Sequence, residues 1–134
     1  NQYVSYDEKS ELVRISQELC AEITDDADKV RAIRDWIKSN VNYDYVLALT
    51  VPSGYLPELD SVISKKMGIC FDYASLAAAM LRVQGVPTKL VIGYADSSYH
   101  SWNEVYVNGQ WMRLDITAQV TNMNVKSYTT ERIY

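Results

Sequence analysis

The stretch Gly68-Ile69-Cys70-Phe71-Asp72-Tyr73-Ala74 decides the fold of this chain. Gly68 breaks the element before it, and from Cys70 to Val83 apolar residues recur at helical spacing. We therefore predict a buried central helix with the Cys70 thiol in its first turn. A first turn has unpaired backbone N–H groups and the positive end of the helix dipole, which lowers a thiol's pKa and binds an oxyanion. Cys70 is thus a candidate nucleophile; the alternative is a small buried hydrophobic residue at a helix start.

The composition indicates one folded domain, which we expect to span residues 1–134. With 134 residues, 48% of them hydrophobic, the chain is long enough to bury its own core. A net charge of -4 and scattered basic residues argue against nucleic-acid binding. No apolar run approaches the roughly 20 residues of a membrane span. The chain begins at Asn1 without an initiating Met, so we expect a domain excised from a longer or exported chain.

Few side chains are available for disulfides or metal sites. Cys20, Cys70 and His100 are the only cysteines and histidine, and they form no C-x-x-C or H-x-x-x-H pattern. We expect no disulfide framework, no metal and no cofactor. Two unpaired thiols fit a cytosolic protein and equally a secreted enzyme with one reactive and one buried cysteine. We favour export to the cell surface or beyond slightly over the cytoplasm.

Hydrophobic periodicity predicts helices before Cys70 and strands after Pro87. Cys20 lies beside the apolar stripe of the first predicted helix, which favours packing over reactivity. We expect helices at about 8–23, 26–39 and 59–66, an extended piece at 41–46, a loop at 50–57, and strands at 89–95, 100–107, 110–117 and about 126–130. The predicted class is therefore α+β, with helices packed against an antiparallel sheet.

The dipeptide Asn108-Gly109 predicts a two-residue hairpin turn, because both residues tolerate positive φ. In that register one strand face carries His100, Trp102, Glu104, Tyr106, Trp111, Arg113, Asp115 and Thr117. The other face, which we expect to be core, carries Val105, Val107, Met112, Leu114 and Ile116. His100 and Asp115 are then diagonal neighbours, close enough to hydrogen-bond.

Cys70, His100 and Asp115 together form a candidate nucleophilic set. A thiolate, an imidazole that takes its proton and a carboxylate that fixes the imidazole tautomer carry out acyl transfer. Alternatively, His100 is a strand-end residue near solvent and Asp115 a turn or cap residue. Trp102, beside His100, either shields the ion pair, lines an acyl-donor tunnel or packs in the sheet. We interpret Glu104 and Arg113 as a cross-strand ion pair rather than a substrate clamp.

Several motifs in one order resemble the transglutaminase-like superfamily of papain-like cysteine enzymes, in its small bacterial form. The matching stretches, within roughly Ala27 to Thr117, are Gly68–Ala74, Met80–Pro87, Gly93-Tyr94, His100–Val105 and Gly109–Thr117. The resemblance implies a core at about 27–117 in which a cysteine-bearing helix packs against an antiparallel sheet. It also implies that Cys70 is the nucleophile, His100 the general base and acid, and Asp115 the residue that orients the histidine.

The resemblance also bears on the oxyanion site, where this chain departs from the family. No equivalent of the oxyanion-binding tryptophan of the animal enzymes is found. Tyr43 or Tyr45 resembles the tyrosine upstream of the cysteine in bacterial members, and its hydroxyl is a candidate for that role. Ile116 and Lys89 stand where members commonly have proline and arginine, respectively.

The predicted function is cysteine-dependent acyl transfer on a protein or peptide. Cys70 attacks a peptide or glutamine-type amide and forms a thioester, which water resolves as hydrolysis or an amine as transglutamination. The sequence does not decide between these two reactions, nor does it fix the oligomeric state. Two alternatives remain: a non-catalytic peptide- or glycan-binding or assembly module on the same fold, and a helper domain that acts beside a partner domain.

Overall fold

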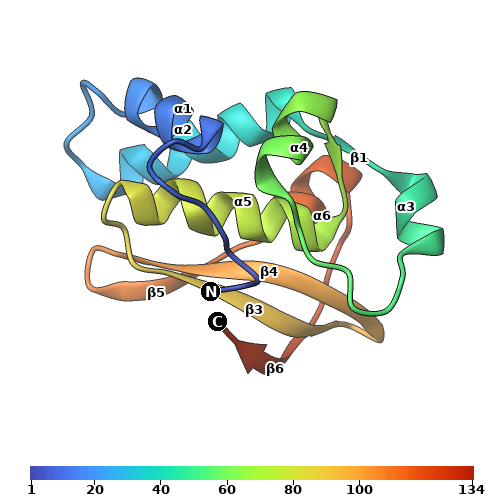
Figure 1. The fold of residues 1–134 in the computed structure, drawn as a ribbon. Coiled ribbons are helices and arrows are strands. Elements are labelled where there is room, and N and C mark those ends of the chain that lie inside the picture. The colour runs from blue at the N-terminus through green and yellow to red at the C-terminus, as the bar shows by residue number, and fades with distance from the viewer.

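The helix α5 (Cys70–Val83) lies between a layer of helices and a four-stranded sheet (Figure 1). The computed structural model describes all of residues 1–134. The remaining helices are α1 (Glu11–Leu19), α2 (Asp26–Asn40), α3 (Tyr45–Thr50), α4 (Leu59–Lys65) and α6 (Ile116–Thr121). The strands are β1 (Asn42–Tyr43), β2 (Met67–Gly68), β3 (Thr88–Ala95), β4 (Ser98–Val107), β5 (Gln110–Leu114) and β6 (Tyr128–Ile133). The α+β class is therefore confirmed.

The central helix is enclosed on both sides, which explains its apolar sequence. Every residue from Asp72 to Leu81 is buried, as expected for a helix covered all round. One side packs against α1 and α2, and the other against β3 and β4. Cys20 is 4% exposed and belongs to this core, as its predicted packing role requires. No helix is both long and apolar enough to cross a membrane.

The antiparallel sheet has the strand order β5-β4-β3-β6. Its hairpin turns at Asn108 and Gly109, whose φ values are 53° and 77°. Val107 pairs with Gln110 and Glu104 with Arg113, so the predicted register is confirmed along β5. The predicted final strand exists as β6, which begins two residues later than expected and ends three residues later. A separate parallel pair, β1 with β2, brings Tyr43 next to Gly68 and so close to the start of α5.

The last predicted hairpin strand is wrong beyond Leu114. The chain leaves the sheet there because the Asp115 side chain accepts a hydrogen bond from the Ala118 backbone and begins α6. Met112 was expected in the core but is 50% exposed. It lies on β5, the edge strand, whereas α5 packs mainly on β3 and β4.

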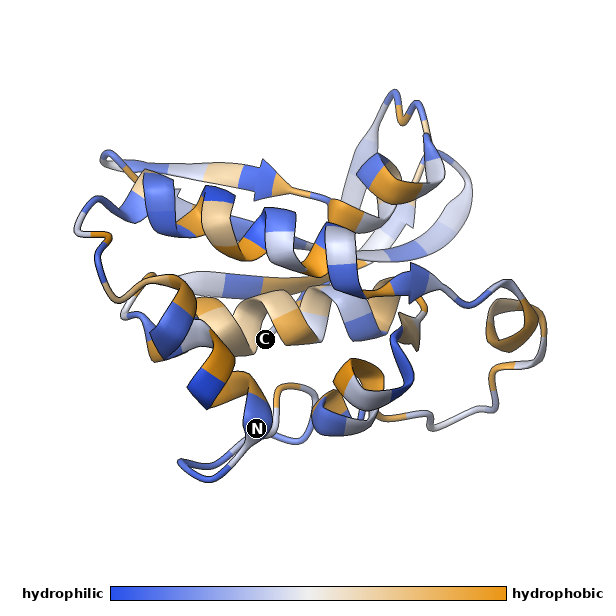
Figure 2. Cartoon of the chain, turned by 90° about the horizontal axis from the view of Figure 1, so that it is seen from above, coloured by the Kyte–Doolittle hydropathy of each residue, from blue (hydrophilic) through white to orange (hydrophobic).

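Two predictions for the N-terminal half also need correction. The first helix covers only residues 11–19 of the expected 8–23. Tyr45 and Val46 were predicted to be extended but begin α3, because Asp44 accepts a hydrogen bond from the Leu47 backbone at 2.9 Å. No residue of α3 is buried, and Figure 2 shows this hydrophobic helix standing apart from the rest of the chain.

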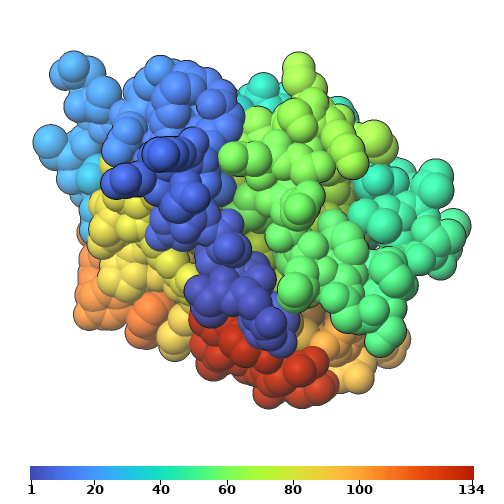
Figure 3. Space-filling model, viewed as in Figure 1, coloured from blue at the N-terminus to red at the C-terminus, as the bar shows by residue number.

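The two ends of the chain meet beside the sheet. Figure 3 shows the N-terminal segment lying along the face of the molecule down to the C-terminal strand. The rings of Tyr3 and Tyr134 are 4.3 Å apart between centroids, and Tyr134 exchanges two backbone hydrogen bonds with Leu90. These contacts hold the C-terminal residues on β3.

Candidate active site

Cys70 lies at the start of α5 because contacts with Asp72 fix the two residues before it, Gly68 and Ile69. The backbone N–H of Ile69, the N-cap residue, donates to Asp72 Oδ2 at 2.9 Å. A Cβ on Gly68 would lie 2.8 Å from Asp72 Cβ, so this position must be glycine for lack of space. The Cys70 side chain is partly exposed, while its backbone lies in the helix turn whose N–H groups have no intrahelical partner.

His100 and Asp115 form the predicted hydrogen bond although Asp115 lies outside the sheet. His100 Nε2 and Asp115 Oδ2 are 2.9 Å apart, and the residues are 4% and 7% exposed. The Tyr128 hydroxyl donates to the same Oδ2 at 2.9 Å, and Asp115 Oδ1 caps α6. Because an ionised carboxylate only accepts, Nε2 of His100 carries a proton. Nδ1 of His100 is therefore the ring nitrogen left for another partner.

The environment of His100 favours its charged form. Burial by itself lowers the pKa of His100, but hydrogen bonds to Asp115 and Cys70 and the negative charges of both groups raise this pKa to about 9. Cys70 therefore lies near enough to the imidazole to contribute to this shift. At neutral pH the His100 ring therefore carries a positive charge.

We expect the free energy of unfolding to fall as pH rises from about 6.5 to about 9. A histidine with a raised pKa in the folded state stabilises fully below its unfolded pKa of 6.5, and this contribution is lost as pH passes the folded value of about 9. The loss reaches about 3 kcal/mol, since one pKa unit corresponds to about 1.4 kcal/mol. Urea denaturation at several pH values measures it. In the His100→Asn variant the free energy of unfolding should no longer fall over this pH range. A wild-type protein that is equally stable at pH 6 and pH 9 would contradict the expectation.

Cys70 opens into a hollow of about 600 Å³, which we call the Cys70 pocket. It is lined by Tyr43, Ala48, Val51, Pro52, Ser53, Gly54, Tyr55, Ile69, Cys70, Phe71, Tyr99, Ser101 and Arg132. Of the two candidate tyrosines, only Tyr43 lines it; Tyr45 is 65% exposed and lines another hollow. Burial, together with the nearby charge of Cys70, raises the pKa of Tyr43 to about 12. The Tyr43 hydroxyl therefore keeps its proton and is a hydrogen-bond donor.

Trp102 covers the histidine rather than lining a tunnel. It is 1% exposed, its ring is stacked with that of His100 at 6.1 Å between centroids, and it is absent from the Cys70 pocket. Tyr128 contacts the indole edge-on at 4.9 Å. Of the predicted roles, shielding of the His100–Asp115 pair fits these contacts, and tunnel lining is wrong. Water is excluded from that pair as a result.

The predicted ion pair between Glu104 and Arg113 is absent, although the two residues are paired across the strands. Glu104 instead lies 3.7 Å from the Lys89 ammonium. The Arg113 guanidinium stacks over the Tyr128 ring at 3.8 Å. An exposed cross-strand ion pair is weak, so Glu104 pairs with the neighbouring lysine and Arg113 stacks on the aromatic ring from β6 instead.

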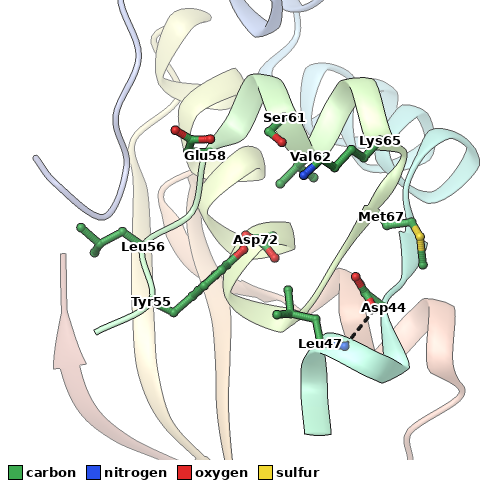
Figure 4. A pocket seen from close by; sticks show the side chains of 10 residues that line it. All are labelled: Asp44, Leu47, Tyr55, Leu56, Glu58, Ser61, Val62, Lys65, Met67 and Asp72. Atoms are coloured by element: carbon green, nitrogen blue, oxygen red, sulfur yellow. Dashed lines mark hydrogen bonds between the residues drawn. The ribbon is translucent and has the colours of Figure 1, made fainter. Parts of the chain in front are cut away.

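Asp72 and its partner Tyr55 were not singled out from the sequence. Asp72 is fully buried, which raises its pKa, and the Ile69 backbone and the Tyr55 hydroxyl donate to it and oppose that rise. The Tyr55 bond, 2.7 Å long, holds the loop before α4 against the start of α5. Tyr55 also borders a second hollow of about 460 Å³ (Figure 4), where it points toward Asp72. The sequence signal that could have singled out Asp72 is an acidic residue in the first turn of a helix.

The residues of β6 that reach this region were also missed. Tyr128 supports Asp115, and Arg132 lines the Cys70 pocket. Both follow the predicted core and lie far from Cys70 in sequence, so no spacing rule points to them. No group of three or more His, Cys, Asp or Glu side chains is placed to hold a metal ion.

Comparison with known structures supports the fold. A protein from Cytophaga hutchinsonii superposes with a TM-score of 0.70 at 22% identity, over 100% of this chain and 51% of that chain. The periplasmic domain of TgpA from Pseudomonas aeruginosa gives a TM-score of 0.70 at 20% identity, over 90% and 47% of the two chains. At these identities the likeness is one of fold.

Comparison of sequences shows the family. The sequence model of the Transglutaminase-like superfamily matches residues 13–116. Kyphoscoliosis peptidase of Mus musculus is 32% identical over 121 residues, which cover 81% of this chain. The chain spans only 18% of the length of that curated relative. The match over residues 13–116 shows that the chain belongs to the transglutaminase-like superfamily, a family of cysteine-based enzymes.

Proposed function

We propose that this chain is a cysteine acyl-transfer enzyme that acts on an amide of a protein or peptide. Cys70 is the nucleophile, His100 the general base and acid, and Asp115 the group that fixes the histidine tautomer. One observation carries the proposal: His100 is bound through Nε2 to Asp115 in a buried pair, and Cys70, at the start of α5, opens into a pocket. This arrangement supplies an activated nucleophile with an oriented base.

The first half of the proposed reaction forms a thioester. The Cys70 thiolate attacks the amide carbon, a C–S bond forms, and the carbonyl electrons move onto oxygen. The Cys70 backbone N–H and the Tyr43 hydroxyl are the donors proposed for this oxyanion, which they would stabilise as charge develops. The His100 imidazolium then gives a proton to the departing amine, and the C–N bond breaks.

The second half releases the acyl group. His100, now neutral, takes a proton from water or from an amine as that nucleophile attacks the thioester, and the Cys70 thiolate departs. Water gives hydrolysis and an amine gives transglutamination. The mouse relative is named a peptidase, which supports hydrolysis here.

Selective alkylation tests the activated thiol without a known substrate. At pH 7 we expect iodoacetamide to modify Cys70 at least about tenfold faster than Cys20, because thiolate content and access control this reaction. Cys20 is 4% exposed, and burial raises its pKa. Mass spectrometry of the native protein, sampled over time, measures both rates.

Two variants serve as matched controls for this labelling. Cys70→Ala should remove the fast site, and Cys20→Ala should keep it. A p-nitrophenyl ester should also leave an acyl group on Cys70 that mass spectrometry detects. Equal labelling rates for the two cysteines, or no acylation of Cys70, would reject the enzyme and favour the non-catalytic binding module.

A further inference from the structure

Of the Asp, Glu, Lys and Arg residues of the chain, only Arg132 lines the Cys70 pocket. It lies on β6, and its Nη2 donates to the Tyr99 hydroxyl at 3.0 Å. No carboxylate of the protein forms an ion pair with it. The other donors of its guanidinium therefore have no charged partner in the protein.

The other five arginines of the chain all have partners within the protein. Arg14 and Arg31 form ion pairs along their own helices, Arg34 pairs with Asp35, and Arg113 stacks over an aromatic ring. Arg82 donates to backbone carbonyls. Arg132 differs from all of these because it lines the pocket into which Cys70 opens and its side-chain partners are tyrosines rather than carboxylates.

The backbone of β6 is irregular where it presents Arg132. Ile92 of β3 pairs with Arg132, but the next residue, Gly93, pairs with Thr130, so Glu131 has no partner on β3. An extra residue of this kind bends a strand and changes the direction of its side chains. Gly93 leaves space for the bend, since a Cβ there would lie 2.0 Å from the Thr129 carbonyl oxygen.

We propose that the Cys70 pocket takes acyl donors that carry a carboxylate, and that Arg132 binds this carboxylate. A guanidinium fork matches a carboxylate in two parallel hydrogen bonds. The chain has a net charge of -4, which would repel an anionic substrate unless a local cation attracts it. This inference rests on the proposed function, because it names the substrate class of the same site. The carboxylate comes either from an acidic side chain or from a peptide C-terminus.

Three alkylating probes of equal size test the inference. They are N-bromoacetyl-glutamic acid α-amide, N-bromoacetyl-glutamine and N-bromoacetyl-glutaminamide. The first has a side-chain carboxylate, the second a terminal carboxylate, and the third none. We expect at least one carboxylate probe to modify Cys70 about three- to tenfold faster than the neutral probe. This is the size of effect expected for a charge-assisted hydrogen bond between Arg132 and the carboxylate that is partly exposed to solvent. The faster carboxylate probe identifies the source, and high salt should reduce its advantage.

Variants assign the preference to Arg132. Arg132→Gln should remove the advantage of the carboxylate probe and leave the neutral probe's rate within about twofold. Arg31→Gln removes an equal charge on α2, outside the pocket, and should keep the advantage. An advantage that persists in Arg132→Gln, or a neutral probe that is fastest in the wild type, overturns the inference while the proposed function stands. Failure of all three probes to modify Cys70 overturns both.

Discussion

Replacement of Asp115 with asparagine is expected to lower kcat by about 1,000-fold while the protein stays folded. Asparagine keeps an Oδ1 that can accept from Ala118 and cap α6. Its amide nitrogen cannot accept the proton that His100 Nε2 now donates. The imidazole is then held in the opposite tautomer, with the proton on the nitrogen that should take one from the thiol. Steady-state release of p-nitrophenolate from an ester measures the effect, and thermal unfolding checks the fold.

Tyr128→Phe is the matched control for that variant. It removes the other hydrogen bond to Asp115 Oδ2 and leaves the His100 contact in place. We expect a loss in kcat of no more than about tenfold, since one supporting bond contributes about 1 kcal/mol. An Asp115→Asn variant no slower than Tyr128→Phe would exclude the proposed orienting role of Asp115.

The parts of the site that could be predicted from sequence depend on local signals. Gly68 and the apolar run after Cys70 gave the central helix and the position of the thiol. Asn108-Gly109 set the hairpin register through positive φ values. These signals act over a few residues, where sterics and side-chain period dominate.

The errors arise where a capping side chain or a distant segment decides the structure. Asp115 and Asp44 each start a helix at a point where alternation suggested a strand. The predicted contact between His100 and Asp115 is present even so, because the helix start lies beside the end of β5 and keeps the carboxylate near the imidazole. Tyr128 and Arg132 reach the site only because β6 pairs with β3. No periodicity in the sequence predicts that pairing.

Gly93→Ala is expected to lower the free energy of unfolding by about 3 kcal/mol or more, because it forces β6 away from β3. Gly93 does not have a positive φ, so the effect comes from space rather than backbone strain. An alanine Cβ would lie 2.0 Å from the Thr129 carbonyl oxygen and 3.1 Å from the Glu131 nitrogen, both backbone atoms that cannot rotate away. Overpacking of this kind costs about 1–3 kcal/mol, and more when backbone must move. Urea denaturation measures the loss.

Gly54→Ala separates steric clash from the general effect of replacing a glycine. Gly54 has a φ of 80° but no atom within 4 Å of its Cβ position, so this variant carries only backbone strain of about 1 kcal/mol. Hydrogen exchange should show β6 amides losing protection in Gly93→Ala and not in Gly54→Ala. Because β6 carries both Tyr128 and Arg132, its release should also remove the carboxylate preference of Cys70 alkylation. If Gly93→Ala is as stable as Gly54→Ala and its β6 amides stay protected, the close approach at Gly93 does not hold β6 in place.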